Sequence, residues 1–129
     1  MVKPVEQADA APEAQAVFEE IKAARGVPDV NAFWKHLAHD PAELRSVWDT
    51  LRDVMAPGAL SPEIKELIYV AVSIANGCDY CIASHSAAAR AKGVTPEMMN
   101  EMRRVVAMAS RTNALAMALR VPVDPQFDE

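Results

Sequence analysis

Two thiols and an imidazole lie close together in residues 78–85, which read CDYCIASH. On an α-helix the offsets of 0, 3 and 7 between Cys78, Cys81 and His85 place the three side chains on one face. The thiolate is the reactive form of cysteine, and a neighbouring base or cation favours it. The spacing therefore predicts a redox-active thiol pair, and the simpler alternative is a pair of small buried apolar residues.

The residues alone leave open which thiol is the nucleophile. The N-terminal end of a helix carries a partial positive charge, and Cys78 is the thiol closer to that end. His85 acts on the other thiol, because Cys81 lies one helical turn away from it. The two effects favour different cysteines.

Glu66 is the other candidate for proton chemistry. It lies at the start of a strongly apolar stretch, on a helix face that continues through Val70 and Ser73. An arbitrary glutamate in the first turns of a helix is usually solvated and stabilised by the helix dipole. The functional interpretation is a partly buried carboxylate with a raised pKa, which passes a proton to or from His85 or a thiol.

A zinc site is the weaker interpretation of the same residues. The cysteine pair and one histidine supply three ligands, whereas structural zinc usually takes four. The fourth would have to be Glu66, His36 or His39, and nothing in their spacing indicates such a site. We therefore expect no metal and no cofactor, and we expect His36 and His39 to lie at the surface or at helix caps.

Composition and charge narrow the class of protein. With 129 residues, 51% of them hydrophobic and 24% charged, the chain is expected to form a single domain over residues 1–129, with loose termini at 1–11 and 121–129. The net charge of -5 argues against a nucleic acid or an anionic membrane as partner. No apolar run approaches the roughly 20 residues that span a bilayer, and residues 1–15 lack a secretory signal. These features predict a cytoplasmic protein.

The elements that position the candidate residues are all expected to be helical. Apolar residues recur at spacings of three and four, Pro and Gly mark the breaks, and no alternating strand pattern is present. After Glu66 one helix is apolar on nearly every side, which indicates burial in the centre of the fold or against another subunit. The predicted architecture is all-α with six or seven helices, at about 12–25, 32–37, 41–55, 62–76, 78–92, 95–109 and 112–119.

The stretch from Leu60 to Gly93 resembles the AhpD-like members of the carboxymuconolactone decarboxylase superfamily. The shared pattern is a glutamate, Glu66, twelve residues before a box in which Cys78, Cys81 and His85 are spaced C-x-x-C-x-x-x-H. The glutamate lies on one helix and the box opens the next. The resemblance implies an AhpD-like helical fold built around this helical hairpin, and it implies homo-oligomers, either trimers or hexamers.

The resemblance also implies a reaction. AhpD-like enzymes reduce organic or hydrogen peroxide without a cofactor, so that Cys81 becomes the peroxidatic thiol and Cys78 the resolving thiol. Glu66 and His85 would form the proton relay that activates Cys81. An external dithiol, in the best-known members a lipoyl-bearing protein, would reduce the resulting disulfide. Tyr80 stands where those members carry a histidine, and we expect it to be a supporting residue.

Two other functions compete with peroxide reduction. The thiol pair could serve as a redox switch or disulfide-exchange partner without peroxide turnover. A decarboxylase-like lyase is the third interpretation. The decarboxylases of the superfamily generally lack the cysteine pair, so Cys78 and Cys81 argue against it.

Overall fold

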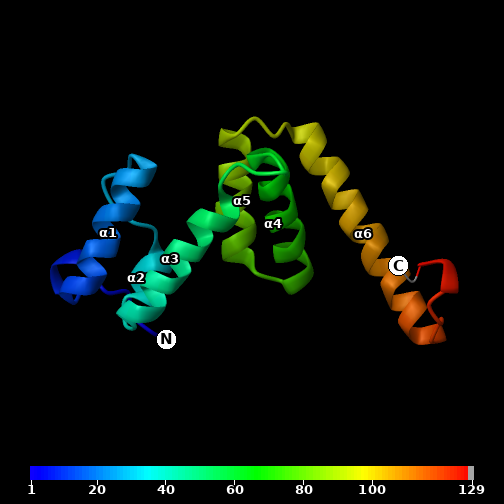
Figure 1. Ribbon diagram of the computed structural model, residues 1–129, viewed down its shortest axis with the longest axis horizontal. Helices are drawn as coiled ribbons and strands as arrows, with labels where there is room; N and C mark the ends of the chain where they lie inside the picture. Colours follow the sequence, from blue (N-terminus) through cyan, green and yellow to red (C-terminus); the bar gives the residue numbers. More distant parts are fainter. Residues whose placement is uncertain (128–129) are drawn as a thin grey trace. The chain divides into compact units, whose positions relative to one another are not determined.

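The computed structural model describes residues 1–127, and every regular element among them is helical (Figure 1). The all-α prediction is therefore confirmed. The chain divides into two compact units, one ending at Ala56 and one beginning at Pro57, and the single domain expected over residues 1–129 stays a prediction. The elements are η1 (Gln7–Asp9), α1 (Pro12–Arg25), α2 (Ala32–Leu37), α3 (Pro41–Met55), α4 (Pro62–Asn76), α5 (Asp79–Ala91), α6 (Pro96–Leu119) and η2 (Pro125–Phe127).

The first unit has an aromatic and aliphatic core formed by α1, α2 and α3. Phe18 and Leu44 are completely buried, and Trp34 and Trp48 are nearly so. The two indole rings meet edge to face, with centroids 5.5 Å apart and an interplanar angle of 87°. Aromatic pairs of this geometry contribute about 0.5–1.5 kcal/mol beyond the burial of their area. This unit carries none of the residues expected to do chemistry.

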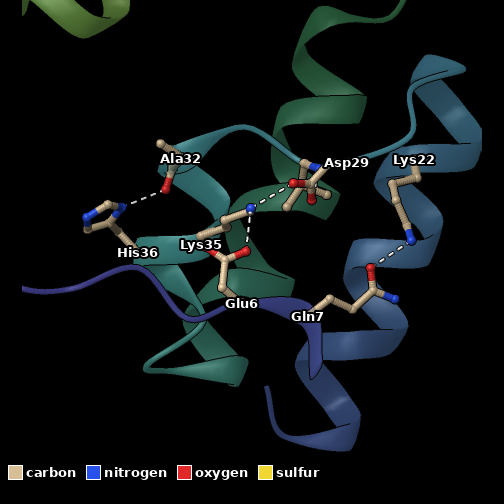
Figure 2. A network of polar contacts seen from close by, with 8 residues as sticks. Glu6, Gln7, Lys22, Asp29, Ala32, Lys35 and His36 are labelled. Atoms are coloured by element: carbon tan, nitrogen blue, oxygen red, sulfur yellow. Dashed lines mark hydrogen bonds and ion pairs between the residues drawn. The ribbon is translucent and has the colours of Figure 1, made fainter. Parts of the chain in front are cut away.

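The amino-terminal segment of the first unit makes backbone and charged contacts, and the expectation that residues 1–11 are loose stays a prediction. The amide of Val5 donates to the carbonyl of Lys35 at 3.0 Å. The ammonium of Lys35 lies 2.6 Å from Glu6 and 2.7 Å from Asp29, and Figure 2 shows this network. Ala10 is also buried and belongs to the apolar core of this unit. These backbone and charged contacts join the segment to Lys35 of α2.

The second unit is built on the hairpin of α4 and α5, which lie side by side (Figure 1). The Ser61 hydroxyl caps the start of α4 by accepting from the amide of Ile64. Gly77 ends α4 with φ at 68°, a left-handed conformation that costs a residue with a side chain roughly 1–2 kcal/mol. Because α5 begins at Asp79, only Gly77 and Cys78 connect the two helices. This short connection sets one face of α4 against one face of α5.

The face of α4 away from the hairpin does not match the expectation of burial on every side. Glu66, Val70 and Ser73 are the buried residues of this helix. Ile64, Ile68 and Val72, by contrast, are 45%, 48% and 52% exposed. Their spacing of four places them on one stripe. The expectation that this apolar helix is shared with another subunit therefore stays a prediction, and full burial within the chain is wrong.

One long helix replaces the two that the sequence predicts at its carboxyl end. α6 runs without interruption for 24 residues, because no Pro or Gly follows Pro96 within it. The hydroxyl of Thr112, expected to open a new helix, instead donates back to the carbonyls of Met108 and Ala109 at 3.1 Å. A hydroxyl can make such a contact in the interior of a helix.

The two halves of α6 differ in burial. Met99 and Met102 pack with Val70 of the hairpin in the core of the second unit. Every described residue from Ala107 onward is exposed. The expected loose tail at 121–129 is exposed through Phe127, and its last two residues lie outside the described part of the chain. None of the helices in residues 1–127 has the length and apolar content that a membrane span requires.

Candidate active site

The hairpin brings Glu66 of α4 and His85 of α5 into direct contact. The Nδ1 atom of His85 lies 2.8 Å from Oε2 of Glu66, although the two residues are 19 positions apart in the chain. The Glu66 side chain is 4% exposed and the His85 side chain is 18% exposed. A carboxylate and an imidazole that share a hydrogen bond in such a location can hold and pass a proton.

The charge state of Glu66 differs from the sequence expectation. Burial raises the pKa of the Glu66 carboxyl, but hydrogen bonds from His85 and Lys92, together with the charge of Lys92, outweigh that effect. The pKa of Glu66 is therefore lowered, and the predicted raised pKa is wrong. An ionised carboxylate only accepts hydrogen bonds, so Nδ1 of His85 carries a proton. In a neutral ring the other nitrogen, Nε2, is then the one that can accept a proton.

Lys92 is a site residue that the sequence analysis did not identify. Its ammonium forms an ion pair with Oε1 of Glu66, the oxygen that His85 does not use. Lys92 follows His85 by seven residues, which is two helical turns. It therefore continues the face that carries Cys78, Cys81 and His85. This spacing of seven residues after His85 is the feature of the sequence from which Lys92 could have been predicted as a site residue.

Tyr69 is the second site residue missed from the sequence. Its ring stacks on the imidazole of His85, with centroids 3.5 Å apart and an interplanar angle of 17°. Tyr69 lies three residues after Glu66, so both side chains project from α4 toward the same part of α5. The edge of the His85 ring is held by Glu66, and its face is held by Tyr69.

The two cysteines are joined as a disulfide at the start of α5. Cys78 is the N-cap residue, with φ at -90° and ψ at 90°, and its Sγ accepts from the amide of Cys81 at 3.3 Å. The Cα atoms of the pair are 5.3 Å apart, which is within the ordinary range for disulfides. Since Cys78 lies just outside the helix, the bond forms without breaking a helical turn. Both residues are partly exposed.

Tyr80, His36 and His39 are the remaining candidates. Tyr80 lies between the cysteines and is 44% exposed, and its supporting role stays a prediction. His36 and His39 belong to the first unit, where their rings contact the carbonyls of Ala32 and Lys3 at 2.7 Å. Within residues 1–127 no three side chains of His, Cys, Asp or Glu form a cluster that could hold a metal ion.

Comparison with known proteins places this chain in a family. Residues 41–124 match the carboxymuconolactone decarboxylase family. Alkyl hydroperoxide reductase AhpD of Solibacter usitatus is 34% identical over 114 residues, which make up 86% of this chain and 62% of that protein. The AhpD of Bradyrhizobium diazoefficiens is 36% identical over 94 residues, which make up 70% of this chain and 50% of that protein. The chain thus spans between half and two-thirds of the length of these relatives.

A solved structure gives the same assignment for the fold. The crystal structure of the alkylhydroperoxidase AhpD core from Rhodospirillum rubrum has a TM-score of 0.93 and 46% identity to this chain. It covers 98% of this chain, and the match takes in 96% of that one. The predicted fold is therefore confirmed beyond its helical class. The chain belongs to the carboxymuconolactone decarboxylase family, among its AhpD-like members.

Proposed function

We propose that this protein is a thiol peroxidase that reduces organic or hydrogen peroxide through Cys78 and Cys81. The hydrogen bond between His85 and Glu66 carries the proposal, because it leaves a basic Nε2 on the residue one helical turn from Cys81. The AhpD names of the relatives support the same chemistry. Cys81 is the peroxidatic thiol, Cys78 resolves it, and Glu66 and His85 relay the proton.

The first step oxidises Cys81 and reduces the peroxide. The thiol of Cys81 gives its proton to Nε2 of His85, while Nδ1–H stays hydrogen-bonded to Glu66. The thiolate attacks the terminal oxygen of the hydroperoxide, so that a sulfur–oxygen bond forms as the oxygen–oxygen bond breaks. The departing alkoxide takes the proton back from Nε2 and leaves as an alcohol, or as water when the substrate is hydrogen peroxide. Cys81 is then a sulfenic acid.

The second step closes the disulfide. The Cys78 thiol attacks the sulfenic sulfur of Cys81, the sulfur–oxygen bond breaks, and the hydroxide leaves as water with the proton of Cys78. The Cα separation of 5.3 Å between the two residues supports this closure. An external dithiol restores both thiols by exchange and becomes a disulfide itself. A lipoyl-bearing protein is the proposed donor, the compartment is cytoplasmic, and the assembly is a homo-oligomer, a trimer or a hexamer.

Peroxide turnover with excess dihydrolipoamide tests the proposal. We expect steady peroxide loss in the wild type and none in Cys81→Ser. His85→Gln should lower kcat/KM about 100-fold or more, the range of general acid–base catalysis. His36→Gln, a histidine of the first unit, is the matched control and should retain wild-type turnover. Full alkylation of both thiols after stoichiometric peroxide, measured by mass spectrometry, would overturn the proposal.

A redox switch or disulfide-exchange protein is the second candidate. The observation in its favour is the disulfide itself, formed between two partly exposed residues at a helix end. This function predicts exchange with dithiols but no catalytic peroxide loss in the same assay. The lyase alternative predicts an activity that survives replacement of both Cys78 and Cys81.

A further inference from the structure

We propose that Lys92 is a positioning residue that keeps Glu66 ionised and thereby reserves His85 as a neutral base with its proton on Nδ1. The catalytic meaning of this role rests on the proposed peroxidase function. The electrostatic role does not rest on that function, because it concerns three side chains whose contacts are independent of any substrate. Lys92 acts through Glu66, and it is not placed against the reacting sulfur atoms.

The contacts divide the two oxygens of Glu66 between two donors. Oε2 accepts from Nδ1 of His85, and Oε1 accepts from the ammonium of Lys92. The Glu66 side chain is 4% exposed, whereas the Lys92 side chain is 37% exposed. A buried carboxylate needs compensation for its charge. Here the hydrogen bond from His85 supplies part of that compensation, and Lys92 adds a full positive charge from the solvent side.

The consequence for His85 follows from the sign of the charges. Without Lys92, the anion of Glu66 would act on His85 unopposed and would favour a second proton on the ring, because a nearby negative charge stabilises a cation. An imidazolium cannot accept a proton from a thiol. With Lys92 present, part of the field of Glu66 is neutralised. The charge of Lys92 therefore opposes the addition of a second proton to the ring.

Glu63, the disulfide and two methionines of α6 supply no positive charge to this triad. Glu63 of α4 interacts electrostatically with Lys92 and adds negative charge to this side of the hairpin. Cys78 and Cys81 carry no charge while they are joined as a disulfide. From α6 the packed residues Met99 and Met102 are apolar.

Titration of the histidine rings by NMR tests the role directly. The oxidised protein is used, because its cysteines do not titrate. In Lys92→Met, which keeps the aliphatic stem, the titration midpoint of the His85 ring should move to higher pH by about one unit, the effect of one nearby charge. Lys92→Arg keeps the charge and should hold the wild-type midpoint. His36 and His39 serve as internal references and should not move.

The outcomes separate this role from the proposed function. An unchanged or lowered midpoint for His85 in folded Lys92→Met would overturn the role of Lys92, even in a protein that turns over peroxide. If wild-type protein shows no peroxide turnover, a raised midpoint still establishes the role. Lys92→Gln repeats the test if Lys92→Met does not fold. In an active protein, the acid limb of the pH profile of kcat/KM should move with the midpoint.

Discussion

The phenol ring of Tyr69 lies nearly parallel to the imidazole of His85, with 3.5 Å between the ring centroids. The two residues come from opposite helices of the hairpin. The stacking restricts the plane of the imidazole, and the hydrogen bond to Glu66 restricts its direction within that plane. A base whose ring is held by two contacts loses little additional freedom when it accepts a proton, which is the purpose of preorganisation.

Two replacements of Tyr69 should separate the contribution of the aromatic ring from that of the hydroxyl. Tyr69→Phe retains the stacked ring, so we expect kcat/KM close to that of the wild type. Tyr69→Leu removes the aromatic contact and should destabilise the protein by about 1 kcal/mol relative to Tyr69→Phe, with a larger loss of turnover. Urea denaturation and peroxide assays measure the two effects. Equal behaviour of the two variants would show that stacking on His85 is unimportant.

Glu66 should make the stability of the protein depend on pH in the acid range. The pKa of its carboxyl is lowered in the folded state, burial being outweighed by His85 and Lys92. Its contribution to the unfolding free energy is therefore complete above the ordinary glutamate pKa and is lost as the pH falls through the folded-state pKa. In Glu66→Gln this part of the acid dependence should disappear, as urea denaturation from pH 7 to about pH 3 will show.

The matched control for this experiment is Glu20→Gln. Glu20 also has a lowered pKa, caused chiefly by its hydrogen bond to Arg45, but its side chain is 41% exposed, against 4% for Glu66. Exposed ion pairs are screened and contribute little to stability. Glu20→Gln should therefore keep the acid dependence of the wild type. An acid dependence in Glu66→Gln identical to that of the wild type would contradict the ionised state of Glu66.

The helices that the sequence predicts well are those with strong end signals. The first helix begins at Pro12 and ends before Gly26, whose φ of 62° is left-handed, and both ends match the prediction. Asp40 caps α3 with hydrogen bonds from the amides of Ala42 and Glu43. The prediction failed in α6, where an end was inferred although no Pro or Gly enforces one. Residues that cap or end a helix can be recognised in the sequence, and where they are absent the helix continues.

The site was predictable only as far as spacing along the chain allows. Cys81 and His85 share α5 and Cys78 is its N-cap residue, so their spacing along the chain already brings them close together. Lys92 and Tyr69 act through contacts between α4 and α5, and which faces of two helices meet is a tertiary property. The sign of the Glu66 pKa shift depends on those contacts. Burial alone would raise the pKa of this carboxyl, and the hydrogen bonds from His85 and Lys92, together with the charge of Lys92, reverse that effect.

Cys78 should contribute to the stability of α5 as well as to disulfide closure. Its Sγ accepts the amide of Cys81 at the N-cap position. In reduced protein, Cys78→Ser keeps an acceptor there, whereas Cys78→Ala leaves the amide without one and should cost about 1 kcal/mol relative to serine. Thermal unfolding in excess reductant compares the two. Equal stability of the serine and alanine variants would argue against the cap.

Cys78→Ser and Cys78→Ala should show the same chemical response to peroxide. With the resolving thiol absent, peroxide is expected to leave Cys81 as a sulfenic acid that a dimedone-type reagent traps, with one adduct per chain detected by mass spectrometry. Wild-type protein should instead form the disulfide and give little adduct. An adduct-free Cys81 in both variants after peroxide would argue against its assignment as the peroxidatic thiol.

The carboxyl-terminal half of α6 should be covered by other copies of this chain in the predicted homo-oligomer. Met108, Leu115 and Met117 are 57%, 52% and 73% exposed, and a monomer seldom leaves so many apolar side chains on one helix in water. Burial in a trimer or hexamer would remove this surface from solvent. Introduction of a charge at Leu115 should then oppose assembly, because an unpaired charge in an apolar interface is costly.

Light scattering at micromolar concentration measures this effect. We expect a mass that is a multiple of the 14.0 kDa chain for the wild type and a smaller mass for Leu115→Glu. Asn113→Glu places the same charge at an exposed polar position of α6 and is the control, for which assembly should be retained. A monomeric mass for the wild type would contradict the predicted oligomer. Equal loss of assembly in both variants would show that charge on α6, and not its apolar surface, controls association.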